Sequence, residues 1–337
     1  MKKHGFLMSI FFIFLAINIS AEAYAKEVVV YTSVDQIFSE PILKAYEKKT
    51  GIKVKAVYDV EAAKTTGIVN RLIAEKKRPK CDVFWNSEFG KTIALKQKGV
   101  LAPYLSPSAS DIPAQFKDKE AFWTGFAARA RVLAYNTDLL NESDVPKSIF
   151  ELTTNKWRGK VAMAYPLFGT TATHIAALWC NPGKMKTQEY LKALRANELV
   201  IVDGNSVVRD LVVEGKVPLG FTDTDDVNVA IQSGKPVKMI YPDHNGIGTL
   251  LIPNTVALIR NAPHPEDGKR FIDYLLSREV ESKLSFCESA QMPLRNNVKT
   301  PASVPEFSSI NYMDVDYYEI AENMDNAARF CQKLFVR

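Results

Sequence analysis

Small and polar residues gather directly after six short apolar runs in the sequence, each of which predicts a β-strand. The residues with the chemistry to bind a ligand are Thr32, Ser33 and Asp35; Glu61, Thr65 and Thr66; Asn86 and Glu88; Gly169, Thr170 and Thr171; Asn205 and Ser206; and Asp223, Asp225 and Asp226. Ligands of open α/β sheets bind outside the carboxyl ends of the strands. The pattern therefore predicts a cleft that holds a polar ligand.

A second interpretation applies to each of these residues alone. Ser, Thr, Asn and Asp are the ordinary N-cap residues of helices that follow strands. Capping does not explain the density of Asp223, Asp225 and Asp226, because one acceptor suffices at a helix start. Three acids this close repel one another unless a cation, a donor or solvent is present. The trio either faces the cleft or lies in a solvated turn.

Two predicted helices open with groups that suit an anion. Thr170 and Thr171 begin one of them, and Asn205 with Ser206 begins another. The free N–H groups and the dipole at a helix start favour negative charge. The two starts could hold opposite sides of one oxyanion, although plain capping remains open for both.

The sequence offers little support for a catalytic site. His174, His244 and His264 have no metal-ligand spacing, and the sequence has no nucleophile elbow, P-loop or complete G-x-G-x-x-G motif. The many acids could in principle supply an acid/base pair for glycoside chemistry. Nothing in the sequence distinguishes such a pair from cap residues, so a secreted hydrolase using paired carboxylates stays open as an alternative.

The first 25 residues have the features of a secretory signal peptide. Lys2 and Lys3 precede an apolar run over about 6–19 that ends in Ala23-Tyr24-Ala25, and the run is shorter than a membrane span. Lys26 follows the predicted cut, where a lipid-anchored chain would have Cys. These features predict cleavage near Ala25 and export to the periplasm.

The charge and the cysteine content of the sequence indicate which partners and disulfides to expect. The formal net charge of +5 is modest and scattered, so we expect no nucleic-acid partner. Four cysteines in an exported chain permit disulfides in three connectivities, and the sequence does not choose among them; they are Cys81, Cys180, Cys287 and Cys331.

Strand-like and helix-like segments alternate along the chain, which predicts an α/β fold. The predicted strands are 28–31, 53–57, 82–85, 161–164, 199–202, 218–221, 237–240 and 255–259. The predicted helices are 37–49, 68–77, 91–98, 173–180, 187–197, 207–214, 269–276 and 317–334.

Two extended segments, 125–136 and 252–257, read as crossings between two lobes. Such strands can act as hinges when two lobes close on a ligand. We expect a monomer in which residues 26–128 and 256–310 form lobe one, and residues 129–255 and 311–337 form lobe two.

Seven segments carry a resemblance to a known family: VVYTS at 29–33, AYEKKTGIKV at 45–54, KCDVFW at 80–85, GVLAPY at 99–104, RARVLAYN at 129–136, WRGKV at 157–161 and PNTVALI at 253–259. In these segments the chain resembles periplasmic solute-binding proteins of the ferric-iron-binding type. The resemblance implies a solute-binding protein that is not an enzyme. It implies the type II binding-protein fold, in which each lobe is a mixed, mainly parallel sheet flanked by helices. It also implies a permease and an ATPase at the inner membrane as partners, because relatives deliver iron, thiamine, phosphorylated sugars or aminophosphonates to an ATP-driven importer.

The resemblance also implies a binding site. Iron binders of this type use a His, a Glu and two adjacent Tyr, and these positions correspond here to Asp35, Glu61, Asp225 and Asp226. These four would be the metal ligands if the ligand is a metal, with the anion held at 169–173 and by Asn205 and Ser206.

The missing phenolates leave the ligand open. Carboxylates suit a hard cation such as iron. They would equally suit the amine of a zwitterion whose phosphonate or phosphate is held by Thr171 and Ser206. We expect no resident cofactor, and the transported ligand is either a metal ion with a bound anion or a small phospho- or amino-organic solute.

Overall fold

The computed structural model describes residues 26–59 and 65–336. The predicted signal peptide and Glu61 lie outside the described residues. Within the described part, no helix is long and apolar enough to cross a membrane.

The first of two sheets has the strand order β2-β1-β3-β10, followed by the first part of β5. Its strands are β1 (Glu27–Thr32), β2 (Lys53–Tyr58), β3 (Val83–Asn86), β4 (Leu101–Ala102), β10 (Leu251–Ile259) and β5 (Thr124–Asn136). β1 pairs in parallel with β2 and β3, whereas β10 is antiparallel to β3, β4 and β5. The helices α1 (Gln36–Thr50), α8 (Pro265–Leu275) and α9 (Arg278–Phe286) pack on one face of this sheet, and α2 (Thr66–Ala74) and α3 (Gly90–Gln97) pack on the other.

The second sheet has β8 at its centre, between the second part of β5 and β6, and β7 lies beyond β6. Its strands are β6 (Val161–Ala164), β7 (Val200–Val202), β8 (Leu219–Asp223) and β9 (Val237–Ile240). β6 is parallel to β7 and β8, and β5 is antiparallel to β8 and β9. The helices α4 (Gly169–Leu178) and α5 (Lys184–Ala196) cover one face, and α6 (Asn205–Val213) and α7 (Thr224–Gln232) cover the other.

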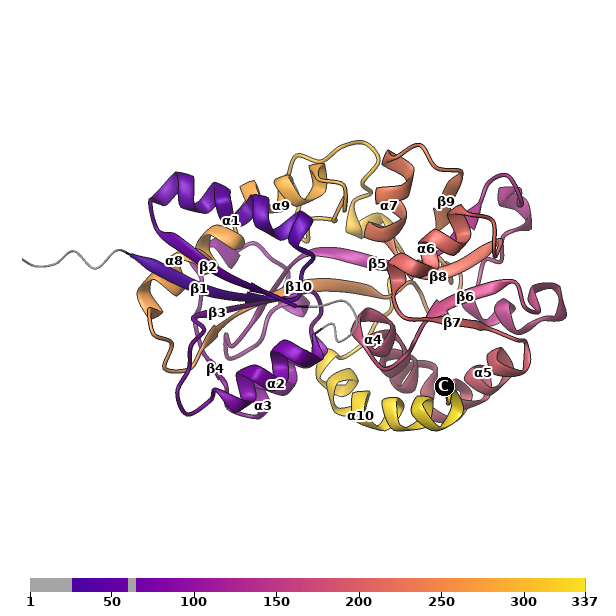
Figure 1. Ribbon diagram of the computed structural model, residues 1–337, viewed down its shortest axis with the longest axis horizontal. Coiled ribbons are helices and arrows are strands. Elements are labelled where there is room, and N and C mark those ends of the chain that lie inside the picture. Colours follow the sequence, from indigo (N-terminus) through magenta and orange to yellow (C-terminus); the bar gives the residue numbers. More distant parts are fainter. Residues whose placement is uncertain (1–25, 60–64, 337) are drawn as a thin grey trace, which may run out of the picture.

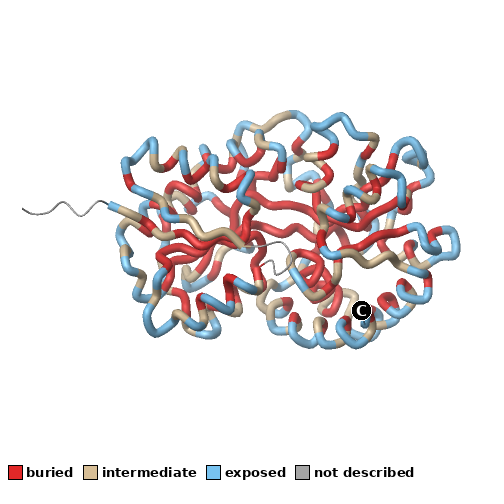
Figure 2. The backbone as a smooth tube through the Cα atoms, in the orientation of Figure 1, coloured by how far each residue is buried: buried red, intermediate tan, exposed pale blue. Residues whose placement is uncertain are grey.

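Strand β5 joins the two sheets (Figure 1). Its residues up to Ala130, apart from Ala127, pair with β10, and those from Arg131 onward pair with β8 and β9. All 13 of its residues are buried. The last helix, α10 (Tyr317–Leu334), packs against both α3 and α4. Buried strands run through the middle of the molecule, and exposed helix surfaces enclose them (Figure 2).

The α/β fold predicted from the sequence is confirmed, and each predicted strand and helix overlaps an observed one. Two helices were not predicted. α7 begins with Thr224, Asp225 and Asp226, which look like a turn, and α9 was missed as well. The predicted crossing at 252–257 and the predicted strand at 255–259 form one continuous strand, β10. All four cysteines are free, so no disulfide forms among them in this structure.

A glycine in the turn that leads into β10 allows a close backbone approach. Gly248 has a φ of 83°, and an added Cβ would lie 2.6 Å from the main-chain carbon of Tyr312. Gly234 has a φ of 69° and no atom within 4 Å of an added Cβ. A substitution would strain the backbone at either glycine, but only at Gly248 would the added side chain also clash with a neighbouring main chain.

We predict that Gly234→Ala lowers the free energy of unfolding by about 1–2 kcal/mol, from left-handed strain alone. Gly248→Ala should cost about 1–3 kcal/mol more, because the main chain of Tyr312 cannot move aside without disturbing its neighbours. Urea unfolding followed by circular dichroism measures both values. Equal losses in the two variants would show that the contact with Tyr312 does not matter.

Candidate functional site

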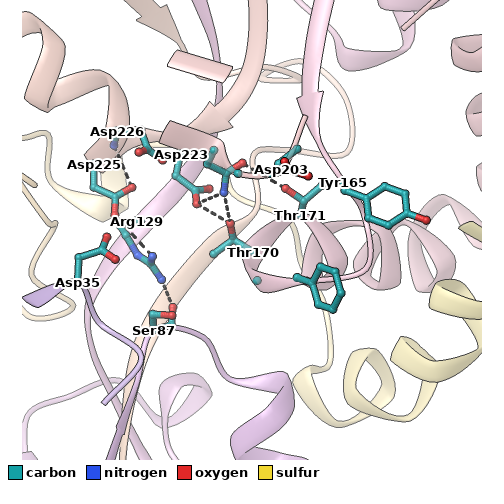
Figure 3. Close-up of a pocket in the computed structure, with 15 residues that line it drawn as sticks. Asp35, Ser87, Arg129, Tyr165, Thr170, Thr171, Asp203, Asp223, Asp225 and Asp226 are labelled. Carbon is teal, nitrogen blue, oxygen red and sulfur yellow. Dashed lines mark hydrogen bonds and ion pairs between the residues drawn. The ribbon is translucent and has the colours of Figure 1, made fainter. Parts of the chain in front are cut away.

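A pocket with a cavity volume of about 40 Å³ opens where the ends of β1 and β3 meet those of β6, β7 and β8 (Figure 3). The first sheet contributes Asp35 and Ser87, and β5 contributes Arg129. The second sheet and its helices contribute Ala164, Tyr165, Phe168, Gly169, Thr170, Thr171, Asp203, Gly204, Asn205, Asp223, Asp225 and Asp226. The structure thus brings together eight of the residues singled out by the sequence. They are Asp35, Gly169, Thr170, Thr171, Asn205, Asp223, Asp225 and Asp226.

Ser206 lies beside this pocket. It lines a neighbouring hollow that shares Asp35, Asp225 and Asp226 with the first and is also bordered by Arg209. Asp225 and Asp226 therefore border both spaces and Asp223 borders the first, which favours the cleft interpretation over a solvated turn.

Four other predicted residues lie outside the pocket and bond within the protein. The Ser33 hydroxyl donates to Asn86 Oδ1 at 2.6 Å, and Thr32 Oγ1 accepts from the Val34 N–H. The Glu88 carboxylate accepts from the N–H groups of Gly90 and Lys91, at the start of α3. These contacts make Thr32, Ser33, Asn86 and Glu88 part of the framework of the β1 and β3 ends.

The predicted pair at the start of α2 also lies outside the residues that line the pocket. The Thr65 N–H donates to Asp59 Oδ2 at 2.5 Å, and Thr66 is the first residue of α2. Glu61 falls in the segment that the structure does not describe, so its placement stays a prediction.

Asp223 is the hub of a buried hydrogen-bond cluster. Its Oδ1 accepts from Arg131 Nη1 at 2.7 Å. Its Oδ2 accepts from the Thr170 hydroxyl at 2.5 Å and from Asn205 Nδ2 at 2.9 Å. Arg131 is fully buried and its guanidinium stacks on the ring of Phe221, 4.6 Å from the centroid. The acid at the end of β8 is therefore held by charge-assisted bonds to groups from β5, α4 and α6.

The same cluster occupies every side-chain donor of Thr170 and Asn205. Thr170 Oγ1 donates to Asp223 and accepts from Asn205 Nδ2 at 2.9 Å and Arg131 Nη1 at 3.3 Å. Asn205 donates both amide hydrogens and its Oδ1 accepts from Arg131 Nη1 and Thr171 Oγ1 at 3.2 Å each. A hydroxyl and an amide offer no further donor once these bonds are made. A ligand would thus meet main-chain N–H groups at these two helix starts.

Charge interactions also shift the ionisation of Asp223. Burial alone would raise the pKa of the Asp223 carboxyl, but Arg131 and Arg129 hold that pKa below its usual value. The carboxylate is consequently ionised near neutral pH and forms a buried ion pair with Arg131.

Arg129 is a pocket residue that the sequence analysis did not single out. It donates to the Ser87 carbonyl in the first sheet, and its Nη1 lies 3.6 Å from Asp225 Oδ2 in the second. Its Nε is buried without a hydrogen-bond partner among the described residues, although the side chain lines the pocket. Arg129 and Arg131 interrupt an otherwise apolar strand, and that interruption was the available signal, because Arg is rarely buried unless it is paired.

The three acids play different parts. Carboxylate oxygens of Asp223, Asp225 and Asp226 all lie within 4.8 Å of one another, a spacing that could hold a cation. Asp223 is already committed to three donors, whereas Asp225 and Asp226 lie in the first turn of α7, where the helix dipole favours negative charge. Arg129 adds a positive charge beside them. The pocket is therefore dipolar rather than uniformly acidic.

We predict that Asp223→Asn lowers the free energy of unfolding by about 3–5 kcal/mol at neutral pH, because it leaves Arg131 buried without its counter-charge. Since the pKa of Asp223 is lowered in the folded protein, its contribution is complete above the ordinary aspartate pKa and is lost as the pH falls through the folded value. The difference in the free energy of unfolding between wild type and Asp223→Asn should therefore decrease only at acidic pH. Denaturant unfolding from pH 3 to 8 measures it, with the exposed Asp210→Asn as the control; a difference that is small at pH 7 would contradict this role.

Comparison with known proteins places this geometry in a family. Residues 42–306 match the model of the bacterial extracellular solute-binding proteins. The chain is 22% identical to the major ferric iron-binding protein of Neisseria meningitidis, over 96% of this chain and 98% of that protein. It is 28% identical to a putative 2-aminoethylphosphonate-binding periplasmic protein of Salmonella typhi, over 84% and 83%.

A solved structure supports the same fold. Iron-bound HitA from Pseudomonas aeruginosa superposes with a TM-score of 0.83 at 22% identity, covering 92% of this chain and all of HitA. The resemblance noted from the sequence is thereby confirmed, and the hydrolase alternative is set aside because the matched family consists of binding proteins. The chain belongs to the bacterial extracellular solute-binding protein family and has the fold of its ferric-iron-binding members.

Proposed function

We propose that this solute-binding protein serves an ATP-binding-cassette importer and captures a small zwitterion, with a phosphonate or phosphate at one end and an amine at the other. The observation that carries the proposal is the dipolar pocket. The starts of α4 and α6 and the buried Arg129 line the same pocket as the carboxylates of Asp35, Asp225 and Asp226.

The anionic end of the ligand would lie at the starts of α4 and α6. The first N–H groups of a helix have no carbonyl partner within the helix, and together with the dipole they attract an anion. Gly169 begins α4 and Asn205 begins α6, and both line the pocket. The buried Arg129 Nε adds an independent donor without a partner among the described residues.

The amine would lie among Asp35, Asp225 and Asp226. Figure 3 shows Asp35 and Asp225 beside Arg129 on one side of the pocket, and Thr171 and Tyr165 on the other. Asp35 comes from the first sheet and the other two acids from α7, so an amine here would contact both halves of the molecule.

Ferric iron with a bound anion is the second candidate. It is favoured by the spacing of Asp223, Asp225 and Asp226 and by the iron-binding relatives. Its ligands would be Asp35, Glu61, Asp225 and Asp226. The commitment of Asp223 to Arg131, and the carboxylates at the positions of the tyrosine pair, weigh against it.

The cellular setting follows from the same proposal. The chain would be exported by the signal peptide of residues 1–25, act as a periplasmic monomer, and present its ligand to the permease and its ATPase. Lobe one would comprise residues 26–128 and 256–310, and lobe two residues 129–255 and 311–337. Closure requires the ligand to bind the closed form better than the open form.

Calorimetric titration tests the ligand class. Wild type should bind 2-aminoethylphosphonate more tightly than ethylphosphonate or ethanolamine, since each of these lacks one charged end. Replacing both Asp225 and Asp226 by Asn should weaken 2-aminoethylphosphonate by about 30-fold or more and leave ethylphosphonate nearly unchanged, because only the amine loses its partners. The exposed Asp210→Asn is the control. Tight binding of ferric citrate, with none of the phosphonate, would reject the zwitterion.

Small-angle scattering tests closure. Adding 2-aminoethylphosphonate should reduce the radius of gyration of wild type, because the amine joins Asp35 to the acids of α7. In the variant that replaces Asp225 and Asp226 by Ala, the same addition should leave the radius unchanged. Compaction that persists in this variant would remove these acids from the closing contact.

A further inference from the structure

Strand β5 contains an extra residue beside the pocket. Phe126 pairs with Asn254 and Ala128 with Pro253, so Ala127 has no residue opposite it on β10. Ala127 is fully buried and has a φ of 43°, in the left-handed region. An extra residue of this kind is a β-bulge, which bends its strand and increases the local twist. Arg129 follows two residues later and lines the pocket.

The bulge is held from outside β5. A left-handed residue other than glycine costs free energy and persists only where its surroundings fix it. The Ala127 N–H donates to Glu281 Oε1 at 3.0 Å, and the Ala127 carbonyl accepts from Asn254 Nδ2 at 2.5 Å. Ala128 then exchanges two hydrogen bonds with Met292, at 2.7 and 2.8 Å. Both main-chain groups of the extra residue are therefore satisfied by side chains.

Glu281 is a rigid anchor for this contact. It lies on α9, is fully buried, and accepts from Arg295 Nε at 2.7 Å and from the Leu294 N–H at 3.0 Å. Arg295 is itself fixed by the Leu276 carbonyl and by Asp111. A buried carboxylate with this many charge-assisted bonds has little freedom to move.

We infer that Glu281 is a positioning residue for the ligand pocket. It fixes the Ala127 bulge, and the bulge sets the direction in which β5 presents Arg129 to the pocket. The inference rests on the proposed role of Arg129 in holding the anionic end of the ligand. Glu281 does not line the pocket, so any effect of its replacement on binding travels through the backbone of β5.

The test compares Glu281→Ala with Glu279→Ala, an exposed glutamate on the same helix that pairs with Lys49 and Lys283. The first measurement needs no ligand: the nitrogen-15 resonance of Arg129 Nε, identified by its absence in Arg129→Lys. It should shift in Glu281→Ala and stay in place in Glu279→Ala. The affinity for 2-aminoethylphosphonate should fall about tenfold or more in Glu281→Ala alone.

Glu281→Gln separates positioning from stability. It keeps an oxygen that accepts from Ala127 and loses the charge that faces Arg295, so its thermal midpoint should fall while the Arg129 resonance stays near its wild-type position. A folded Glu281→Ala protein with an unshifted Arg129 resonance and wild-type affinity would overturn the inference. A wild type that binds none of the probes would reject the proposed ligand, while a shifted resonance would still support the positioning role.

If Glu281→Ala does not fold, variants of the bulge test the same step. Val is strained at a φ of 43°, and Gly adopts it freely. The Arg129 resonance should therefore move in Ala127→Val and remain in Ala127→Gly. An identical resonance in both variants would overturn the inference.

Discussion

The arrangement of this molecule depends on a buried charge on the strand that joins its two sheets. Arg131 lies where β5 leaves β10 and begins to pair with β8, and it is fully buried. A buried guanidinium without a counter-charge would destabilise the fold by several kcal/mol. Asp223 supplies that charge from the end of β8, and its second oxygen gathers Thr170 from α4 and Asn205 from α6.

Residues of the same type have different roles in this arrangement. Asp223, Thr170 and Asn205 hold the helix starts in place, and their bonds leave the main-chain N–H groups to meet an anion. Asp225 and Asp226, in the first turn of α7, keep a negative field beside Arg129. Because the framework and the ligand groups are separate, a common fold can accept different ligands when only the second set changes.

The periodicity of the sequence was enough to predict the α/β fold, because strands and helices alternate with clear changes of period. The convergence of the strand ends also followed, since parallel strands end at the same edge of a sheet. The distinction between framework and pocket did not follow. Ser33 and Glu88 look like ligand groups in the sequence, yet Ser33 bonds to Asn86, and Glu88 bonds to the start of α3 and to Thr173 of α4.

Other features depend on contacts between distant residues. Asp223 and Arg131 are 92 residues apart, and Ala127 and Glu281 are 154 apart, so no local pattern reveals either pair. Alanine also has no preference for the left-handed region, and the bulge in β5 therefore leaves no mark in the sequence. A charged residue inside an apolar strand, such as Arg129, was the signal that deserved more weight.

Native mass spectrometry of the protein purified from its source organism without added ligand, combined with elemental analysis, distinguishes a zwitterion from iron in the pocket. We expect one bound organic molecule per chain that contains phosphorus and an amine, and no stoichiometric metal. Stoichiometric iron without such a molecule would contradict this expectation.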